Sequence, residues 1–90
     1  MTKEEIVALT NQVFEQSFEI EPARLVPQAR IFDELGLDSL DIVDLIVALQ
    51  KKFGVRIRED ERVQKIRTLA DIYDFILILK QAERKDGRAP

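Results

Sequence analysis

The segment from residue 40 to residue 53 is the feature that most limits how this chain can fold. Eight of its fourteen residues are large and apolar, and on a helix of about 3.6 residues per turn they would cover most of the circumference. Such a helix has to be covered on several sides or to present an apolar face to a partner. We therefore predict a helix that ends near Phe53 and packs against other helices of the same chain.

Short capping patterns predict where the helices begin. Asp38 can cap the apolar helix, and Gly54 is its expected end. Acids in its first two turns and two lysines in its last turn suit the helix dipole. Thr2 with Glu5 has the spacing of a capping box, and an apolar stripe predicts a first helix that ends near residues 16–18.

A second capping box predicts the last helix. Thr68 precedes Asp71 by three residues, and apolar residues then recur at helical spacing as far as Leu79. Residues 59–65 indicate a short charged helix, after a short extended stretch at 55–58. The sequence thus predicts an all-α fold with three longer helices and one short one, in a domain spanning residues 1–82. Residues 83–90 are predicted to form a polar, disordered tail.

The composition excludes most kinds of catalytic site. The chain has no cysteine and no histidine, so it offers no thiolate or imidazole for nucleophilic catalysis, for a metal site or for an iron–sulfur cluster. We predict neither a catalytic residue nor a metal site, and hence a protein that is acted upon rather than an enzyme. The sequence also shows no apolar run of the length of a membrane span and no targeting peptide, so cytoplasm is the expected location.

Ser39 is the residue that could carry chemistry. A long connection at residues 20–37, containing Pro22, Pro27 and Gly36, leads to it, and acids flank it. Serine at a helix start is commonly a structural residue, and no histidine could activate it as a nucleophile. Its hydroxyl is better suited to covalent modification, because a phosphate attached there would meet free backbone N–H groups at the positive end of the helix.

The residues around Ser39 carry a resemblance to a known family. The string at 35–40 reads Leu-Gly-Leu-Asp-Ser-Leu and is followed by aliphatic residues at helical spacing. This pattern, together with the predicted order of helices and the long connection, resembles an acyl carrier protein over nearly the whole chain. The resemblance implies a four-helix acyl-carrier-like bundle with the long loop between its first two helices.

The resemblance also implies how such a protein works. Ser39 would hold a covalent 4'-phosphopantetheine group, transferred from coenzyme A by a phosphopantetheinyl transferase. The arm would carry acyl groups as thioesters to the loading, elongating and acyl-transferring enzymes of fatty-acid, lipid or polyketide synthesis. Acyl chains would fold back between the second and third helices. The residues expected to line that pocket are Val43, Val47, Ile57, Ile66 and Tyr73.

Partner enzymes are expected to dock at the central helix, and here the sequence departs from the family pattern. The docking candidates are Asp38, Leu40, Asp41, Asp44, Lys51 and Lys52. Fatty-acid carriers commonly continue the acidic face to the end of this helix, where this chain has two lysines. Residues 33–44 hold five acids and no base, whereas residues 50–67 hold seven bases and three acids. We interpret this polarity as a specialised carrier that has at least one partner with both acids and bases on its docking surface.

Several alternatives remain open from the sequence. The cargo could be an aminoacyl or D-alanyl group, or a specialised fatty acid for an envelope lipid. The chain could also be a small helical interaction module without a prosthetic group. The net charge of −3 argues against nucleic acid as the main partner. We expect a monomer with no stable membrane insertion.

Overall fold

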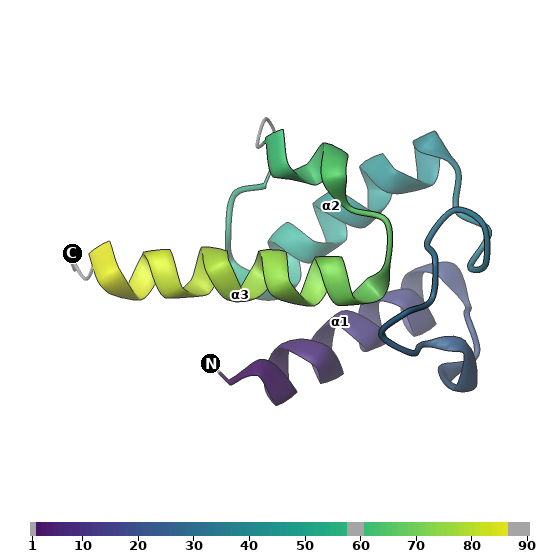
Figure 1. The fold of residues 1–90 in the computed structure, drawn as a ribbon, viewed down its shortest axis with the longest axis horizontal. Coiled ribbons are helices and arrows are strands. Elements are labelled where there is room, and N and C mark those ends of the chain that lie inside the picture. Colours follow the sequence, from purple (N-terminus) through teal and green to yellow (C-terminus); the bar gives the residue numbers. More distant parts are fainter. Residues whose placement is uncertain (1, 58–60, 87–90) are drawn as a thin grey trace.

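Three α-helices form the body of the molecule. The computed structural model describes residues 2–57 and 61–86. Helix α1 (Lys3–Phe18) packs against both α2 (Ser39–Phe53) and α3 (Leu69–Asp86). The long connection between α1 and α2 lies at the end of the bundle where α1 ends and the other two helices begin (Figure 1).

The helix boundaries follow the predicted caps. Thr2 and Glu5 form the capping box of α1, and Asp38 and Asp41 form that of α2. Helix α2 ends at Gly54, whose φ of 68° lies in the left-handed region that favours glycine. The Thr68 hydroxyl accepts a hydrogen bond from the Asp71 N–H at 3.3 Å and so caps α3. These expectations are confirmed.

Three details differ from the expectation. Residues Glu61–Lys65 form a 3₁₀ helix, η2, in place of the short fourth α-helix, and a further 3₁₀ turn, η1 (Pro22–Arg24), begins at a proline. Residues 55–57 belong to no strand, and residue 58 lies outside the described residues. Helix α3 continues to Asp86, so the first four residues of the predicted tail are helical, because helix-forming residues continue to that point. Residues 87–90 lie outside the described residues.

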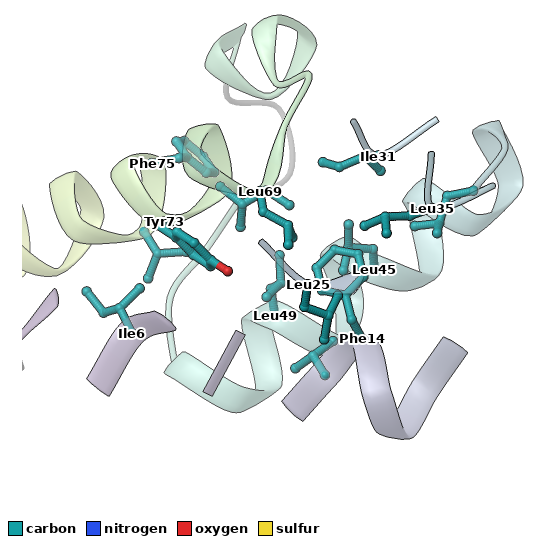
Figure 2. Close-up of a cluster of buried hydrophobic side chains, with 14 of the residues drawn as sticks. Ile6, Phe14, Leu25, Ile31, Leu35, Leu45, Leu49, Leu69, Tyr73 and Phe75 are labelled. Atoms are coloured by element: carbon teal, nitrogen blue, oxygen red, sulfur yellow. The ribbon is translucent and has the colours of Figure 1, made fainter. Parts of the chain in front are cut away.

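The core lies where the three helices and the connection meet. Figure 2 shows side chains from all of them converging: Ile6 and Phe14 of α1, Leu45 and Leu49 of α2, Leu69 of α3, and Leu25, Ile31 and Leu35 of the connection. Ile31 is fully buried. The connection is therefore part of the core rather than a surface loop, which explains why so long a segment holds one shape.

Two polar side chains lie within this apolar interior. The Tyr73 hydroxyl donates a hydrogen bond to Asn11 Oδ1 at 2.6 Å, which joins α3 to α1. Thr10 is fully buried, and its Oγ1 has no hydrogen-bond partner among the described residues. An unpaired buried hydroxyl destabilises a fold, whereas a paired one is close to neutral or favourable.

We predict that Thr10→Val stabilises the protein. Valine keeps the branched shape and removes the unpaired hydroxyl, so the free energy of unfolding should rise by about 1 kcal/mol. Urea denaturation followed by circular dichroism measures the change. Thr10→Ala is the control and should be less stable than Thr10→Val, because it leaves a small cavity. A loss of stability in Thr10→Val would contradict the prediction.

We predict that the stabilising effect of the Tyr73 hydroxyl depends on pH. Burial raises the pKa of Tyr73 above its ordinary value, with the hydrogen bond to Asn11 acting in the opposite direction. The folded state therefore keeps the phenol neutral at a pH where the unfolded chain begins to ionise, about pH 10. The stability contributed by the hydroxyl is present below that pH and is lost as the pH rises through the folded-state pKa.

The measurement compares wild type with Tyr73→Phe in denaturant titrations from about pH 8 to about pH 11. Wild type should be more stable by about 1 kcal/mol at the lower pH, because the variant lacks the hydrogen bond. The difference should shrink above about pH 10. A difference that stays constant across the range would show that the phenol titrates alike in both states.

Candidate functional site

Ser39 is the first residue of α2, and its side chain is exposed. The neighbouring carboxylates hold the start of the helix in place. Asp38 Oδ1 accepts hydrogen bonds from the N–H groups of Leu40 and Asp41 at 3.0 and 2.9 Å, and Asp41 Oδ2 accepts one from the Asp38 N–H at 3.1 Å. This reciprocal capping fixes the backbone on both sides of Ser39 without using its hydroxyl.

The chemistry available at this helix start differs from the expectation in one respect. The N–H groups of Leu40 and Asp41 already bind Asp38, so an attached phosphate would not find these two groups free, in contrast to the expectation for this helix start. The Ser39 hydroxyl itself makes no hydrogen bond within the part of the chain that the structure describes. The serine thus presents an unengaged oxygen on a rigid support.

A cavity of about 340 Å³ lies next to this helix. It is bounded by α2, η2, α3 and the connection and is partly open to solvent, and its lining is mostly apolar. The apolar side chains that line it include Ile31, Ile42, Ile46, Ile57, Ile66 and Phe75, together with Leu45 and Leu49 of the core. Polar groups enter it only through Gln64 and Arg67 among the described residues, and Phe32, 44% exposed, lies at its rim.

Ser39 and the cavity lie on the same side of α2. Ile42 and Ile46 follow Ser39 by three and seven residues, a spacing that places them on one helix face. Ile42 is about 4.5 Å further along the helix axis, at 1.5 Å per residue. A flexible arm attached to the serine would therefore begin on the side of α2 that borders the apolar cavity, so the residues present fit such a group.

The structure separates the five residues expected to line the pocket. Ile57 is buried and Ile66 half-buried, and both line the cavity. Val43 and Val47 do not line the cavity, because both lie on the side of α2 that faces solvent. They are 58% and 44% exposed.

Tyr73 is the remaining expected pocket residue, and it also lies outside the cavity. Its ring lies on the α1 side of α3, where its hydroxyl binds Asn11. Phe75, which lines the cavity, projects from the opposite side of the same helix (Figure 2). Residues two positions apart on a helix differ by about 200° in direction, so the two rings cannot share a face.

The expected docking residues lie along α2. Asp38, Leu40, Asp41 and Asp44 are at its start, while Lys51 and Lys52 are exposed in its last turn. Leu40 is 77% exposed, the highest value among the large apolar residues described as exposed. The two ends of α2 therefore carry opposite charge, and an uncovered leucine stands beside the serine.

Sequence reasoning missed the cavity residues Ile31, Phe32, Ile42 and Ile46. No pattern in the sequence selects Ile42 and Ile46, because apolar residues occur all around this helix. Ile31 and Phe32 belong to the irregular connection, where no periodicity indicates direction. No group of three or more carboxylate side chains in the described ranges is placed to hold a metal ion. Of the helices seen within residues 2–57 and 61–86, none has the length and hydropathy required to cross a membrane.

Comparisons with known proteins agree with this arrangement. Residues 11–76 match the family model described as a phosphopantetheine attachment site. The chain is 43% identical over 82 residues to acyl carrier protein 2 of Ralstonia nicotianae, covering 91% of this chain and all of that protein. It is 35% identical to the meromycolate extension acyl carrier protein of Mycobacterium leprae, covering 99% of this chain and 76% of that protein.

A solved structure shows the same fold. The acyl carrier protein from Enterococcus faecalis superposes with a TM-score of 0.70 at 29% identity, covering 88% of this chain and 99% of that one. Since the family match spans most of the chain and the relatives agree with it, the chain belongs to the acyl carrier protein family, whose members bear covalent 4'-phosphopantetheine and are carriers rather than enzymes.

Proposed function

We propose that Ser39 is the attachment point of the phosphopantetheine group and that the cavity beneath it receives the cargo. The observation that carries this proposal is the position of an exposed, unengaged hydroxyl on the same face of α2 as an apolar cavity. When attached, the group supplies a terminal thiol that holds an acyl chain as a thioester. The protein itself holds the serine at a fixed helix start and shelters part of the acyl group from water.

The cavity supports an aliphatic acyl cargo. Its volume of about 340 Å³ and its mostly apolar lining give room for part of an aliphatic chain. Burial of each methylene group contributes about 0.8 kcal/mol. An aminoacyl or D-alanyl cargo gains nothing there, because its ammonium group would lose hydration in an apolar space whose charged lining residue, Arg67, is also a cation.

The start of α2 supports docking by the enzymes that act on the serine. Members of this family interact with phosphopantetheinyl transferases and with biosynthetic enzymes. The first two turns of α2 carry the negative charges of Asp38, Asp41 and Asp44, which would steer a basic partner surface toward the serine end of the helix. Leu40 offers an apolar contact beside the reacting oxygen. We further propose that the carrier acts as a monomer, since one chain encloses the whole core.

We predict that Ser39→Ala abolishes attachment. Wild type and variant are incubated with coenzyme A, magnesium and a broad-specificity phosphopantetheinyl transferase, and their intact masses are measured. Wild type should gain one phosphopantetheine and the variant none, because alanine has no oxygen to accept it. A gain in the variant would place the attachment on another residue, and no gain in either would reject the proposal.

We predict that filling the cavity removes the stabilisation that an acyl chain provides. A medium-length acyl group loaded onto wild type should raise the Tm relative to the unacylated form, by about 4–8 °C for each kcal/mol gained. Ile46→Phe places a larger side chain in the cavity lining and should reduce this rise by half or more. Differential scanning calorimetry measures both forms.

Val43→Phe is the matched control for this experiment. It lies on the same helix but faces solvent, so the rise in Tm on acylation should equal that of wild type. If both variants keep the full rise, the acyl chain does not occupy this cavity.

A further inference from the structure

The mouth and the floor of the cavity beside α2 differ in polarity. The exposed lining residues mark the mouth, and these are Phe32, Gln64 and Arg67. The buried lining residues, among them Ile57 and Phe75, mark the floor and are apolar. Ligand sites commonly combine an apolar lining with a few polar groups that fix the orientation of the ligand. The polar groups of this cavity therefore meet the part of a ligand that stays at the mouth.

The guanidinium group of Arg67 is held at this mouth from one side. Its Nη1 donates hydrogen bonds to the carbonyl oxygens of Gln64 and Ile66 at 2.8 and 3.0 Å. Its Nε and Nη2 have no hydrogen bond or ion pair with any residue in the described ranges. The nearby Asp71 carboxylate binds the backbone N–H groups of Arg67 and Thr68 instead. An arginine has five N–H donors, so those on Nε and Nη2 are available to a ligand.

Backbone hydrogen bonds place Arg67 at the end of the cavity nearer to Ser39. The Ile31 N–H binds the Arg67 carbonyl at 2.9 Å, and the Leu37 N–H binds the Ile31 carbonyl at 3.2 Å. Leu37 is the second residue before Ser39. The segment between η2 and α3, which contains Arg67, also lies on the side of the bundle where α2 begins (Figure 1). The first atoms of a cargo that enters from the serine end therefore pass Arg67.

This arrangement distinguishes between kinds of acyl chain. The aliphatic tail fills the apolar floor, whereas the carbon atoms next to the thioester stay at the mouth. A plain chain offers no acceptor there to the free N–H groups of Arg67. A chain with an oxygen on one of its first carbon atoms does, and a hydrogen bond to a charged donor is stronger than one between neutral groups.

We propose that Arg67 selects an acyl chain that bears a hydroxyl group close to the thioester, as in a 3-hydroxyacyl group. The hydroxyl oxygen accepts a hydrogen bond from the free side of the guanidinium group. Gln64, at the same mouth, offers an amide oxygen that accepts the hydroxyl proton. This inference rests on the proposed function and adds the chemical class of the cargo.

A 3-oxoacyl group is the competing source of an acceptor oxygen. Its carbonyl oxygen accepts from Arg67 but has no proton to donate to Gln64, so it uses one of the two residues where the hydroxyl uses both. The test therefore includes chains of both kinds.

The test compares three cargoes of equal length on three proteins. Wild type, Arg67→Met and Lys65→Met are loaded with octanoyl, 3-hydroxyoctanoyl and 3-oxooctanoyl groups from the corresponding coenzyme A thioesters. Methionine keeps an apolar stem and removes the donors. Lys65 is the matched control, because it is an exposed base on η2 that does not line this cavity.

Differential scanning calorimetry measures the rise in Tm of each loaded form over the unacylated form of the same protein. Any loss of stability caused by removing the Nη1 hydrogen bonds then cancels. In wild type the 3-hydroxy chain should raise the Tm about 4 °C further than the plain chain. In Arg67→Met it should raise the Tm less than the plain chain, because the hydroxyl loses water without gaining a donor. Lys65→Met should behave as wild type.

A second measurement follows Arg67 directly. The Nε–H signal of Arg67 in ¹⁵N-edited NMR spectra should move further on loading with the 3-hydroxy chain than with the plain chain. Equal movement with both chains would contradict a hydrogen bond to the hydroxyl.

The outcomes separate this inference from the proposal on which it rests. If wild type gains no phosphopantetheine, the proposed function fails and the inference fails with it. If the plain chain raises the Tm but the effect of the hydroxyl is the same in wild type and Arg67→Met, the inference alone is overturned. A larger rise with the 3-oxo chain than with the 3-hydroxy chain would overturn the choice of a hydroxyl group.

Discussion

Backbone hydrogen bonds between the long connection and the start of α3 determine the shape of this molecule. The N–H groups of Leu69 and Ala70 bind the carbonyl oxygens of Ala29 and Pro27 at 3.1 and 2.8 Å, and the Ile31 N–H binds the Arg67 carbonyl at 2.9 Å. A helix start leaves N–H groups without partners, and here the connection satisfies two of them. The same bonds hold an irregular segment in the core, where its own polar backbone needs partners.

The position of the connection accounts for both halves of the candidate site. The backbone bond between Ile31 and Arg67 fixes the connection here, and the next residue, Phe32, therefore lies at the rim of the cavity. A few residues later, Gly36 turns with a φ of 75°, a value that favours glycine, and leads the chain to Asp38 and the start of α2. One segment therefore shapes the cavity and places the serine above it.

The apolar character of α2 is explained by three uses of its surface. Leu45 and Leu49 are buried in the core and also line the cavity, Ile42 and Ile46 line the cavity, and Leu40, Val43 and Val47 face solvent. A helix that only stabilised the bundle would need one apolar face. The remaining apolar surface is costly in a free protein and is consistent with a helix that contacts both a cargo and a partner.

The helix boundaries and the position of Ser39 were predictable because caps act within a few residues of the chain: Thr2, Asp38, Gly54 and Thr68 each determine a helix end locally. The family resemblance at residues 35–40 is recognisable from the sequence because the motif is also a short, local pattern. The short fourth helix lies in the segment that the sequence predicts but is a 3₁₀ helix, and α3 extends past its predicted end, because polar composition does not distinguish an exposed helical turn from a tail. The faces of α2 could not be read from periodicity, since its apolar residues surround the helix.

Thus the sequence alone determined that this chain is a helical carrier with a serine at the start of its most apolar helix, because capping, periodicity and the motif are local properties. Only the tertiary structure decided that Ile42 and Ile46 line the cavity while Val43 and Val47 face solvent. Adjacent residues on a helix differ by about 100° in direction. The side of α2 that is covered depends on where α1, α3 and the connection pack. Contacts between residues far apart in the chain determine that packing.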